Sequence, residues 1–127
     1  RLADAERHGH LHDHYRSVAL STGAAVDPRR LAHLLERPPA GCYRIKGVVW
    51  FDKPGHRMRH TVHAVGGFVR VTRDSWGREP RHTDLVVIGA GMDVRAARTA
   101  LDDVLATAET VADEHGILHI TRHLHAT

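Results

Sequence analysis

The chain has 127 residues, of which 42% are hydrophobic and 26% are charged, and its formal net charge is +3. This length predicts one compact domain with flanking tails, and no apolar run reaches the roughly 18 residues that a membrane-spanning helix needs. The single cysteine, Cys42, excludes an internal disulfide and a cysteine-rich zinc cluster, so any metal site must use histidine and carboxylate ligands.

The first residues, RLADAER, lack the apolar core of a signal peptide, and we therefore expect a cytoplasmic protein that has no membrane partner. The chain starts with Arg1 rather than methionine, which indicates a piece of a longer protein or a processed product. Basic residues are scattered and mixed with acidic ones, and few aromatic side chains are present to stack on bases. This composition favours a solvated basic surface over a nucleic-acid-binding groove.

A histidine-rich segment, RHGHLHDHY, occupies residues 7–15, and its histidines fall at alternate positions: His8, His10, His12 and His14. Neutral imidazole is a good ligand for Zn²⁺, Co²⁺ and Ni²⁺. In a strand, alternate side chains lie about 7 Å apart, too far for one ion with metal–nitrogen bonds of about 2 Å, and Gly9 disfavours a helix. We therefore expect residues 1–15 to be a flexible linker that binds metal weakly and exchangeably, or a solvated linker without a metal role.

The next segments alternate between strand and helix patterns. Residues 16–22 and 42–51 carry short apolar runs that are typical of strands. Between them, Asp27 is placed as an N-cap, Pro28 fits the first helical position and Pro38 ends the pattern, which predicts a helix. The apolar stripe of this helix consists of Leu31, Leu34 and Leu35.

Alternation and glycine punctuation organise the second half of the chain. Residues 57–72 alternate polar and apolar side chains on both sides of a Gly-Gly pair, which predicts strands joined by a tight turn. Residues 84–91 form a continuous apolar run that is typical of a strand buried on both faces. Asp93 is placed as the cap of a helix that we expect to run to about residue 107, followed by a second helical piece over 108–115.

These elements predict an α+β domain, with a largely antiparallel sheet of four to five strands, helices packed against it and the order β-α-β-β-β-β-α. We expect the domain to span residues 16–107 and a helical or extended tail to span 108–127. Three histidines recur in that tail at a spacing of four: His115, His119 and His123. In a helix an adjacent pair could hold a metal ion, but Gly116 argues against an unbroken helix, and an edge strand or an exposed polar face fits equally.

Arg44, Lys46 and Trp50 are the residues that we assign to an interaction surface. Arg44 and Lys46 share one face of their strand and could meet an anionic group of a partner, although solvated or paired charges are the simpler explanation. Trp50 and Phe51 point to opposite faces, so one should pack in the core while the other helps to form a contact surface.

Other candidate residues receive structural roles. His33 is expected to be partly buried beside the leucine stripe, and Cys42 to be a small core residue. His60 and His63 fall on opposite faces of one strand, so they cannot form a pair. No Ser/His/Asp or Cys/His arrangement suggests catalysis, and the Gly-Ala-Gly after the apolar strand lacks the rest of a dinucleotide fingerprint, so we expect no enzyme activity from this chain alone.

Several motifs and their order resemble a known family. The strand YRIKGVVWF carries Arg44, Lys46 and Gly47, a paired glycine and a tryptophan-containing loop follow, and HTDLVVIGAGMD then leads from an apolar strand into a helix. In this order, over residues 17–107, the chain resembles the carboxy-terminal domain of the CobW-type metallochaperone GTPases.

The resemblance implies a two-part protein, in which an amino-terminal P-loop GTPase that binds zinc, cobalt or a related metal is joined to this smaller domain by a linker. That linker is histidine-rich in many members. The resemblance also places GTP and Mg²⁺ binding in the GTPase half, together with the family's Cys-x-Cys-Cys metal motif. This chain has no G-x-x-x-x-G-K-[ST] motif, so we expect it not to hydrolyse GTP by itself.

Our leading hypothesis is a metal-handling and interaction domain of a CobW-like zinc or cobalt metallochaperone. The histidine linker would collect metal for transfer rather than for structure, and the sheet would dock the GTPase half or a client metalloprotein. One alternative is a structural or regulatory domain that binds no metal itself, and another is a basic nucleic-acid-binding module. The metal, the client and the oligomeric state, including a homo-oligomer, stay open.

Overall fold

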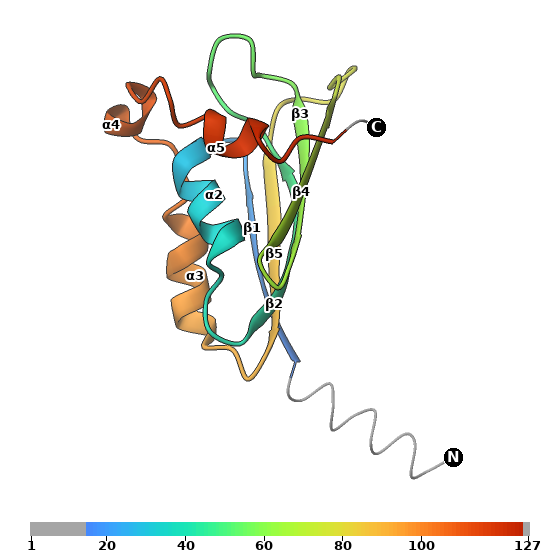
Figure 1. Cartoon of the computed structure of the whole chain (residues 1–127), viewed down its shortest axis with the longest axis vertical. Coiled ribbons are helices and arrows are strands. Elements are labelled where there is room, and N and C mark those ends of the chain that lie inside the picture. The colour runs from blue at the N-terminus through green and yellow to red at the C-terminus, as the bar shows by residue number, and fades with distance from the viewer. Residues whose placement is uncertain (1–14, 126–127) are drawn as a thin grey trace.

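Five antiparallel strands form one layer of the molecule (Figure 1), whose computed structural model describes residues 15–125. The strands are β1 (Tyr15–Thr22), β2 (Cys42–Val49), β3 (Arg59–Val65), β4 (Phe68–Asp74) and β5 (Thr83–Ala90). Their order across the sheet is β1-β5-β2-β3-β4, and every neighbouring pair is antiparallel. The expected α+β fold with an antiparallel sheet is confirmed, and β5, the last strand in the sequence, lies between β1 and β2.

The two longer helices, α2 (Pro28–Glu36) and α3 (Val94–Asp102), lie on one face of this sheet (Figure 1). They are followed by two short helices, α4 (Ala108–Val111) and α5 (Leu118–Thr121). Helix α2 packs against β3, β4 and α5, whereas α3 packs against β1 and β5, so the longer helices cover opposite halves of the same face. Within residues 15–125, no helix has the length and apolar character to span a membrane.

Local sequence explains where the two longer helices begin. The side chain of Asp27 accepts a hydrogen bond from the backbone N–H of Arg30 at 2.9 Å, and proline occupies the first position, where a missing N–H costs nothing. The side chain of Asp93 likewise accepts hydrogen bonds from the backbone N–H groups of Arg95 and Ala96. Both predicted caps are confirmed.

Helix α3 ends at Asp102, earlier than the predicted end near residue 107. The backbone N–H of Asp27 donates to the carbonyl of Val104 at 2.7 Å, and the segments before α2 and after α3 form an isolated antiparallel bridge. Val104 is buried in this arrangement. The predicted end was wrong because a backbone pairing between distant segments replaces the last helical turn and buries the same side chain. Helix α4 is also shorter than the expected 108–115.

The hydrophobic core lies between the helices and the sheet. Among its largest fully buried side chains are Leu31, Leu35, Ile45, Phe51, Leu85 and Leu101. Phe51 is fully buried while Trp50 is half-buried, so one ring packs in the core as expected. Cys42 packs against this core, and burial raises the pKa of its thiol, which fits the expected structural role.

Three histidines of the domain have distinct environments. His60, on the core face of β3, is fully buried and meets Phe51 edge to face, with 4.9 Å between ring centroids. His63 is half-buried on the other face, which confirms that these two histidines do not pair. His33 is exposed, so the expectation of partial burial was wrong; the leucines of α2 take the side that faces the sheet.

The C-terminal tail returns to the main domain over α2 and β4. Ile117 and Ile120 are buried there, and the tail ends against the edge strand β4. The backbone N–H of Val71 donates to the carbonyl of His123 at 3.0 Å, and the N–H of His125 donates to the carbonyl of Val71 at 2.8 Å. The sequence left a helix and an edge strand open as alternatives for the tail. The tail contains both, since α5 is a short helix and Leu124 then forms a bridge with the edge strand β4.

Candidate interaction face of the sheet

The face of the sheet opposite α2 and α3 is not covered by a helix in the part of the chain that the structure describes (Figure 1). Because side chains alternate along a strand, β5 buries Leu85 and Val87 under the helices and turns Asp84, Val86 and Ile88 the other way. We call this second side the open face. Its central members on the other strands are Arg44, Lys46, Val48, Thr61, His63, Val65, Phe68, Arg70 and Thr72.

Strand register arranges the side chains of the open face in rows. One row consists of Val86, Lys46, His63 and Arg70. The neighbouring row consists of Ile88, Arg44, Val65 and Phe68. Arg44 and Lys46 therefore share a face, as their spacing predicted. Phe68 is 86% exposed and Val65 is 48% exposed, so apolar surface lies directly beside the basic side chains.

A groove of about 460 Å³ lies over β2 on the open face. The residues around it include Arg44, Lys46, Val48, Arg59, Thr61, His63 and Val86. Gly47 also lines the groove, and a Cβ atom at this position would lie 2.0 Å from the carbonyl oxygen of Asp84. Any side chain at position 47 would push β2 away from β5, so the close approach of these two strands requires glycine.

Positive charge dominates this groove. Its charged lining residues are Arg44, Lys46, Arg59 and Asp84. Asp84 already accepts a hydrogen bond from the hydroxyl of Ser21 at 2.9 Å. Nε of Arg44 and Nε2 of His63 are shielded from solvent and have no hydrogen-bond partner within residues 15–125. Because an unsatisfied buried polar group costs about 1–3 kcal/mol, the groove suits a surface that offers acceptors such as carboxylates.

Trp50 is not among the residues that line this groove. Its indole N–H donates to the carbonyl of Gly23 at 3.0 Å, and the guanidinium of Arg81 lies 5.6 Å from the centroid of its ring. The first contact fastens the segment after β2 to the loop that precedes α2, and the second joins it to the loop that precedes β5. The structure therefore brings Arg44 and Lys46 together and gives Trp50 a different set of neighbours.

His119 and His123 of the tail contact side chains of α2. Nε2 of His119 lies 3.0 Å from a guanidinium nitrogen of Arg29, and Nε2 of His123 lies 2.8 Å from a carboxylate oxygen of Glu36. His115 is exposed in the turn before α5. Burial opposes ionisation of Glu36, but hydrogen bonds from its tail partners outweigh this and lower the pKa of its carboxyl group.

Metal binding by the histidines stays a prediction. Within residues 15–125, no group of three or more His, Cys, Asp or Glu side chains is arranged to hold a metal ion. The tail histidines His115, His119 and His123 therefore do not form such a group in this structure. The four linker positions His8, His10, His12 and His14 lie outside the described residues.

Sequence reasoning missed the polar contacts that attach the tail. Asp113 accepts a hydrogen bond from Arg29 at 2.7 Å, and this guanidinium lowers the pKa of the carboxyl group to about 2. The Lys53 ammonium donates to three carbonyls, those of Thr110, Val111 and Asp113. Arg29 and Asp113 are 84 positions apart in the chain, so no local pattern could have signalled this contact.

The fold and the motifs are shared with known proteins. Residues 15–105 match the family model described as cobalamin synthesis protein cobW C-terminal domain. The zinc chaperone CobW of Sinorhizobium sp is 40% identical over 100 residues, which cover 72% of this chain and 28% of that protein.

Solved structures extend the comparison. The crystal structure of the Zn(II)-bound YjiA GTPase from E. coli matches with a TM-score of 0.57 and 25% sequence identity, over 72% of this chain and 30% of that one. A Zn(II)-bound triple mutant of YjiA matches to the same extent. This chain thus spans less than a third of the length of these relatives. Because the family match covers most of its residues, the chain belongs to the family of CobW C-terminal domains.

Proposed function

We propose that this domain is the interaction and metal-handling part of a GTP-dependent zinc chaperone. The observation that carries the proposal is the open face, where Arg44 and Lys46 stand beside apolar side chains and two shielded nitrogen atoms have no hydrogen-bond partner in the described part of the chain. The relatives are named as a zinc chaperone and a Zn(II)-bound GTPase, and the matching region is less than a third of each. We expect the GTPase half of the parent protein in the remainder.

The open face docks the GTPase half. A complementary surface places carboxylates against Arg44 and Lys46 and an apolar patch against Val65 and Phe68. Docking would give the shielded nitrogens of Arg44 and His63 the hydrogen-bond partners that they lack within the described chain. Charge complementarity of this kind mainly sets the orientation and the choice of partner, while the apolar contacts supply affinity.

The size of the open face fits a partner on the same chain. Five strands spaced about 4.8 Å apart, with about seven residues each, give a face of roughly 24 by 24 Å. Its area is somewhat smaller than the roughly 800 Å² that a standard interface takes from each partner. A covalently linked partner needs less contact area, because the linker keeps its effective concentration near the millimolar range.

The histidine linker collects the cargo. His8, His10, His12 and His14 supply imidazoles to a zinc ion, or to cobalt in a second version of the proposal. An imidazole must lose its proton before it binds, and its ordinary pKa is about 6.5. The linker therefore loads near neutral pH and releases its metal on mild acidification.

Binding measurements on the two halves test the docking proposal. The sequence encoded upstream should contain a P-loop, and the GTPase half made from it should bind this chain in a titration followed by calorimetry. The double substitution Arg44→Glu with Lys46→Glu should weaken binding by about tenfold or more, because two attractive contacts become repulsive. The control is Arg78→Glu with Arg95→Glu, which reverses two exposed arginines away from the groove. Equal affinity of all three proteins would reject docking through the open face.

Metal titration tests the cargo proposal separately. Calorimetry with Zn²⁺ and with Co²⁺ should show uptake at pH 7.5 and little at pH 5.5, because protonated imidazole is not a ligand. Replacing the four linker histidines by alanine should remove most of this uptake. Unchanged uptake would exclude the linker as the collector, whatever the outcome of the docking test.

A structural role without metal is a second candidate for the tail histidines. His119 and His123 already contact Arg29 and Glu36, which supports a function in fastening the tail to α2. If this is their function, replacing both by alanine leaves zinc uptake unchanged and lowers the stability of the tail, measured by hydrogen exchange at the amides of α5.

A further inference from the structure

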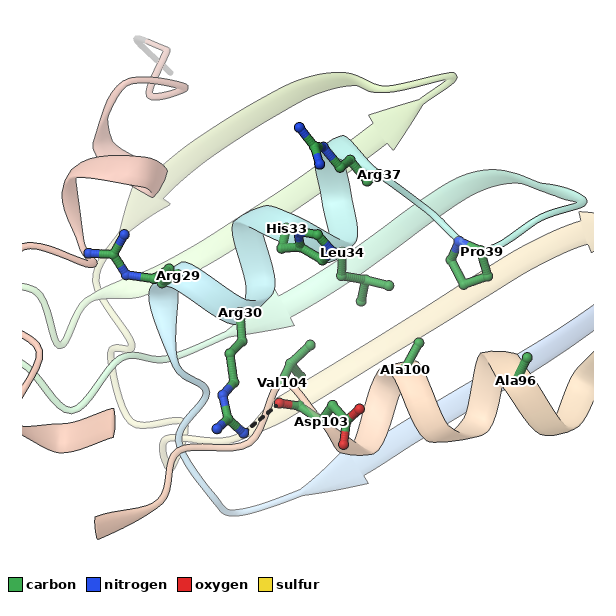
Figure 2. Close-up of a pocket in the computed structure, with 10 residues that line it drawn as sticks. All are labelled: Arg29, Arg30, His33, Leu34, Arg37, Pro39, Ala96, Ala100, Asp103 and Val104. Carbon is green, nitrogen blue, oxygen red and sulfur yellow. Dashed lines mark hydrogen bonds between the residues drawn. The ribbon is translucent and has the colours of Figure 1, made fainter. Parts of the chain in front are cut away.

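A cleft of about 780 Å³ lies between α2 and α3, on the side of the sheet opposite the open face (Figure 2). It exists because α2 packs on β3 and β4 while α3 packs on β1 and β5, which leaves a space between the helices above the middle of the sheet. One helix side lines each wall. From α2 and α3 come Leu34, His33, Arg30, Ala96 and Ala100, together with Arg37 at the end of α2.

The floor of this interhelical cleft is apolar. Leu34, Ala96 and Ala100 point into the space between the helices (Figure 2), and the buried Val104 closes the floor at one end. Ala96 and Ala100 have small side chains, so an apolar side chain or a third helix can approach the backbones of both helices closely. The cleft therefore offers an apolar seat of the kind that an amphipathic helix fills.

The rim of the cleft is basic. Arg30, His33 and Arg37 follow one another at i, i+3 and i+7 along α2, over about 10 Å of helix. A guanidinium nitrogen of Arg30 donates to the carbonyl of Asp103 at 3.3 Å, shown as a dashed line in Figure 2. The side chains of His33 and Arg37 are exposed and have no hydrogen-bond or ion-pair partner within residues 15–125.

We infer that the interhelical cleft binds an acidic amphipathic helix of a protein partner. Its apolar side chains would lie on Ala96 and Ala100, above the buried Leu34, and its carboxylates, repeating at i, i+3 or i+4 and i+7, would meet Arg30, His33 and Arg37. Arg29 also lines the cleft but is already paired with Asp113, whereas Arg30 and Arg37 face only the single carboxylate of Asp103, so charge complementarity selects an acidic helix over a basic one. The inference does not depend on the proposed function, because this cleft and the open face lie on opposite sides of the sheet.

Titration of the isotopically labelled chain with synthetic helical peptides tests the inference. The probe is a peptide of about 15 residues with leucines on one helical side and glutamates flanking them, and its counterpart carries lysine in place of each glutamate. The acidic peptide should shift the amide resonances of Leu34, Ala96 and Ala100 with a Kd below about 1 mM, and the basic peptide should not. Arg37→Glu should raise this Kd by about tenfold, and the matched control Arg95→Glu on α3 should not change it.

Filling the cleft provides an independent check. Ala100→Leu should abolish the shifts, whereas Thr99→Leu, on the exposed side of the same helix turn, should preserve them. Circular dichroism melts of each variant show whether the fold is intact, and Arg37→Glu keeps the test decisive if Ala100→Leu fails to fold. Absence of shifts at the cleft, equal binding of the basic peptide, shifts on the open face alone, or stronger cleft shifts with an RNA oligonucleotide would each overturn the inference.

Discussion

The two faces of the sheet are built from the same five strands and differ completely in chemistry. On the covered face, Ile45, Val62 and Val87 are buried against the helices. On the open face, the adjacent positions Arg44 and His63 surround a basic groove. Alternation along each strand means that every second residue serves stability and the residues between them are free to serve recognition. Substitutions on the two faces should therefore have different consequences.

Gly47 allows the close approach of β2 and β5, on which both faces of the sheet depend, and its substitution should have the largest effect on stability. A Cβ atom here would lie 2.0 Å from the carbonyl oxygen of Asp84, and the positive φ of +153° disfavours other residues. Gly47→Ala should separate β2 from β5 and lower the free energy of unfolding by more than about 4 kcal/mol. Urea denaturation measures this loss. Gly55→Ala is the control, because this turn glycine has a positive φ but no atom within 4 Å of an added Cβ.

Two neighbouring valines compare the faces directly. Val49 is fully buried on the covered face, and Val48 is half-buried on the open face. Val49→Ala should lower the free energy of unfolding by about 2 kcal/mol, because two methyl groups are no longer buried and a cavity is left behind. Val48→Ala should lower it by under about 1 kcal/mol. Equal losses in the urea midpoints of the two variants would mean that the open face contributes to stability as much as the core does.

The comparison also shows which features can be read from the sequence. Asp27 and Asp93 cap their helices as predicted. Arg44 and Lys46 lie on the same face because side chains alternate along a strand. Both features depend on neighbouring residues, so the sequence pattern predicts them. The early end of α3 could not be predicted in this way, because it depends on a backbone bridge with the segment before α2.

The interhelical cleft was missed for the same physical reason. Its walls come from α2 and α3, and the space between them is set by the strands on which each helix packs, β3 and β4 for α2 and β1 and β5 for α3. The sequence pattern identified each helix but not the spacing between them. Likewise, the exposure of His33 depends on where the sheet side of α2 lies, and the contact of Arg29 with Asp113 depends on the path of the tail.

The buried His60 of β3 makes stability on the covered face sensitive to pH. Burial lowers the pKa of His60, and the nearby positive charges of Arg73 and His56 lower it further, although a hydrogen bond to the carbonyl of Met58 opposes them. The unfolded chain binds this proton below its ordinary pKa of about 6.5 while the folded chain does not, so stability falls as pH drops below about 6.5. The loss continues until the pH reaches the lower pKa of the folded state.

His60→Leu should therefore reduce the loss of stability between pH 7.5 and pH 5.5, whereas Thr61→Val, which changes the open face of the same strand without removing a titratable group, should leave that loss unchanged. Thermal unfolding of the three proteins at both pH values measures the difference. A pH dependence that stays the same in His60→Leu would contradict the assignment of the buried histidine as the acid-sensitive group.

The smallest effect on stability is expected where recognition should suffer most. Lys46 is exposed on the same strand face as Arg44, so its positive charge is repelled by that guanidinium and gains little from the folded state. Lys46→Ala should change the free energy of unfolding by under about 0.5 kcal/mol, and any gain at low salt should vanish at high salt because of screening. If the proposed docking is right, the same variant should lose affinity for the GTPase half. If it instead lost stability while keeping its affinity, Lys46 would belong to the scaffold, and recognition would have to lie on the helix side of the sheet.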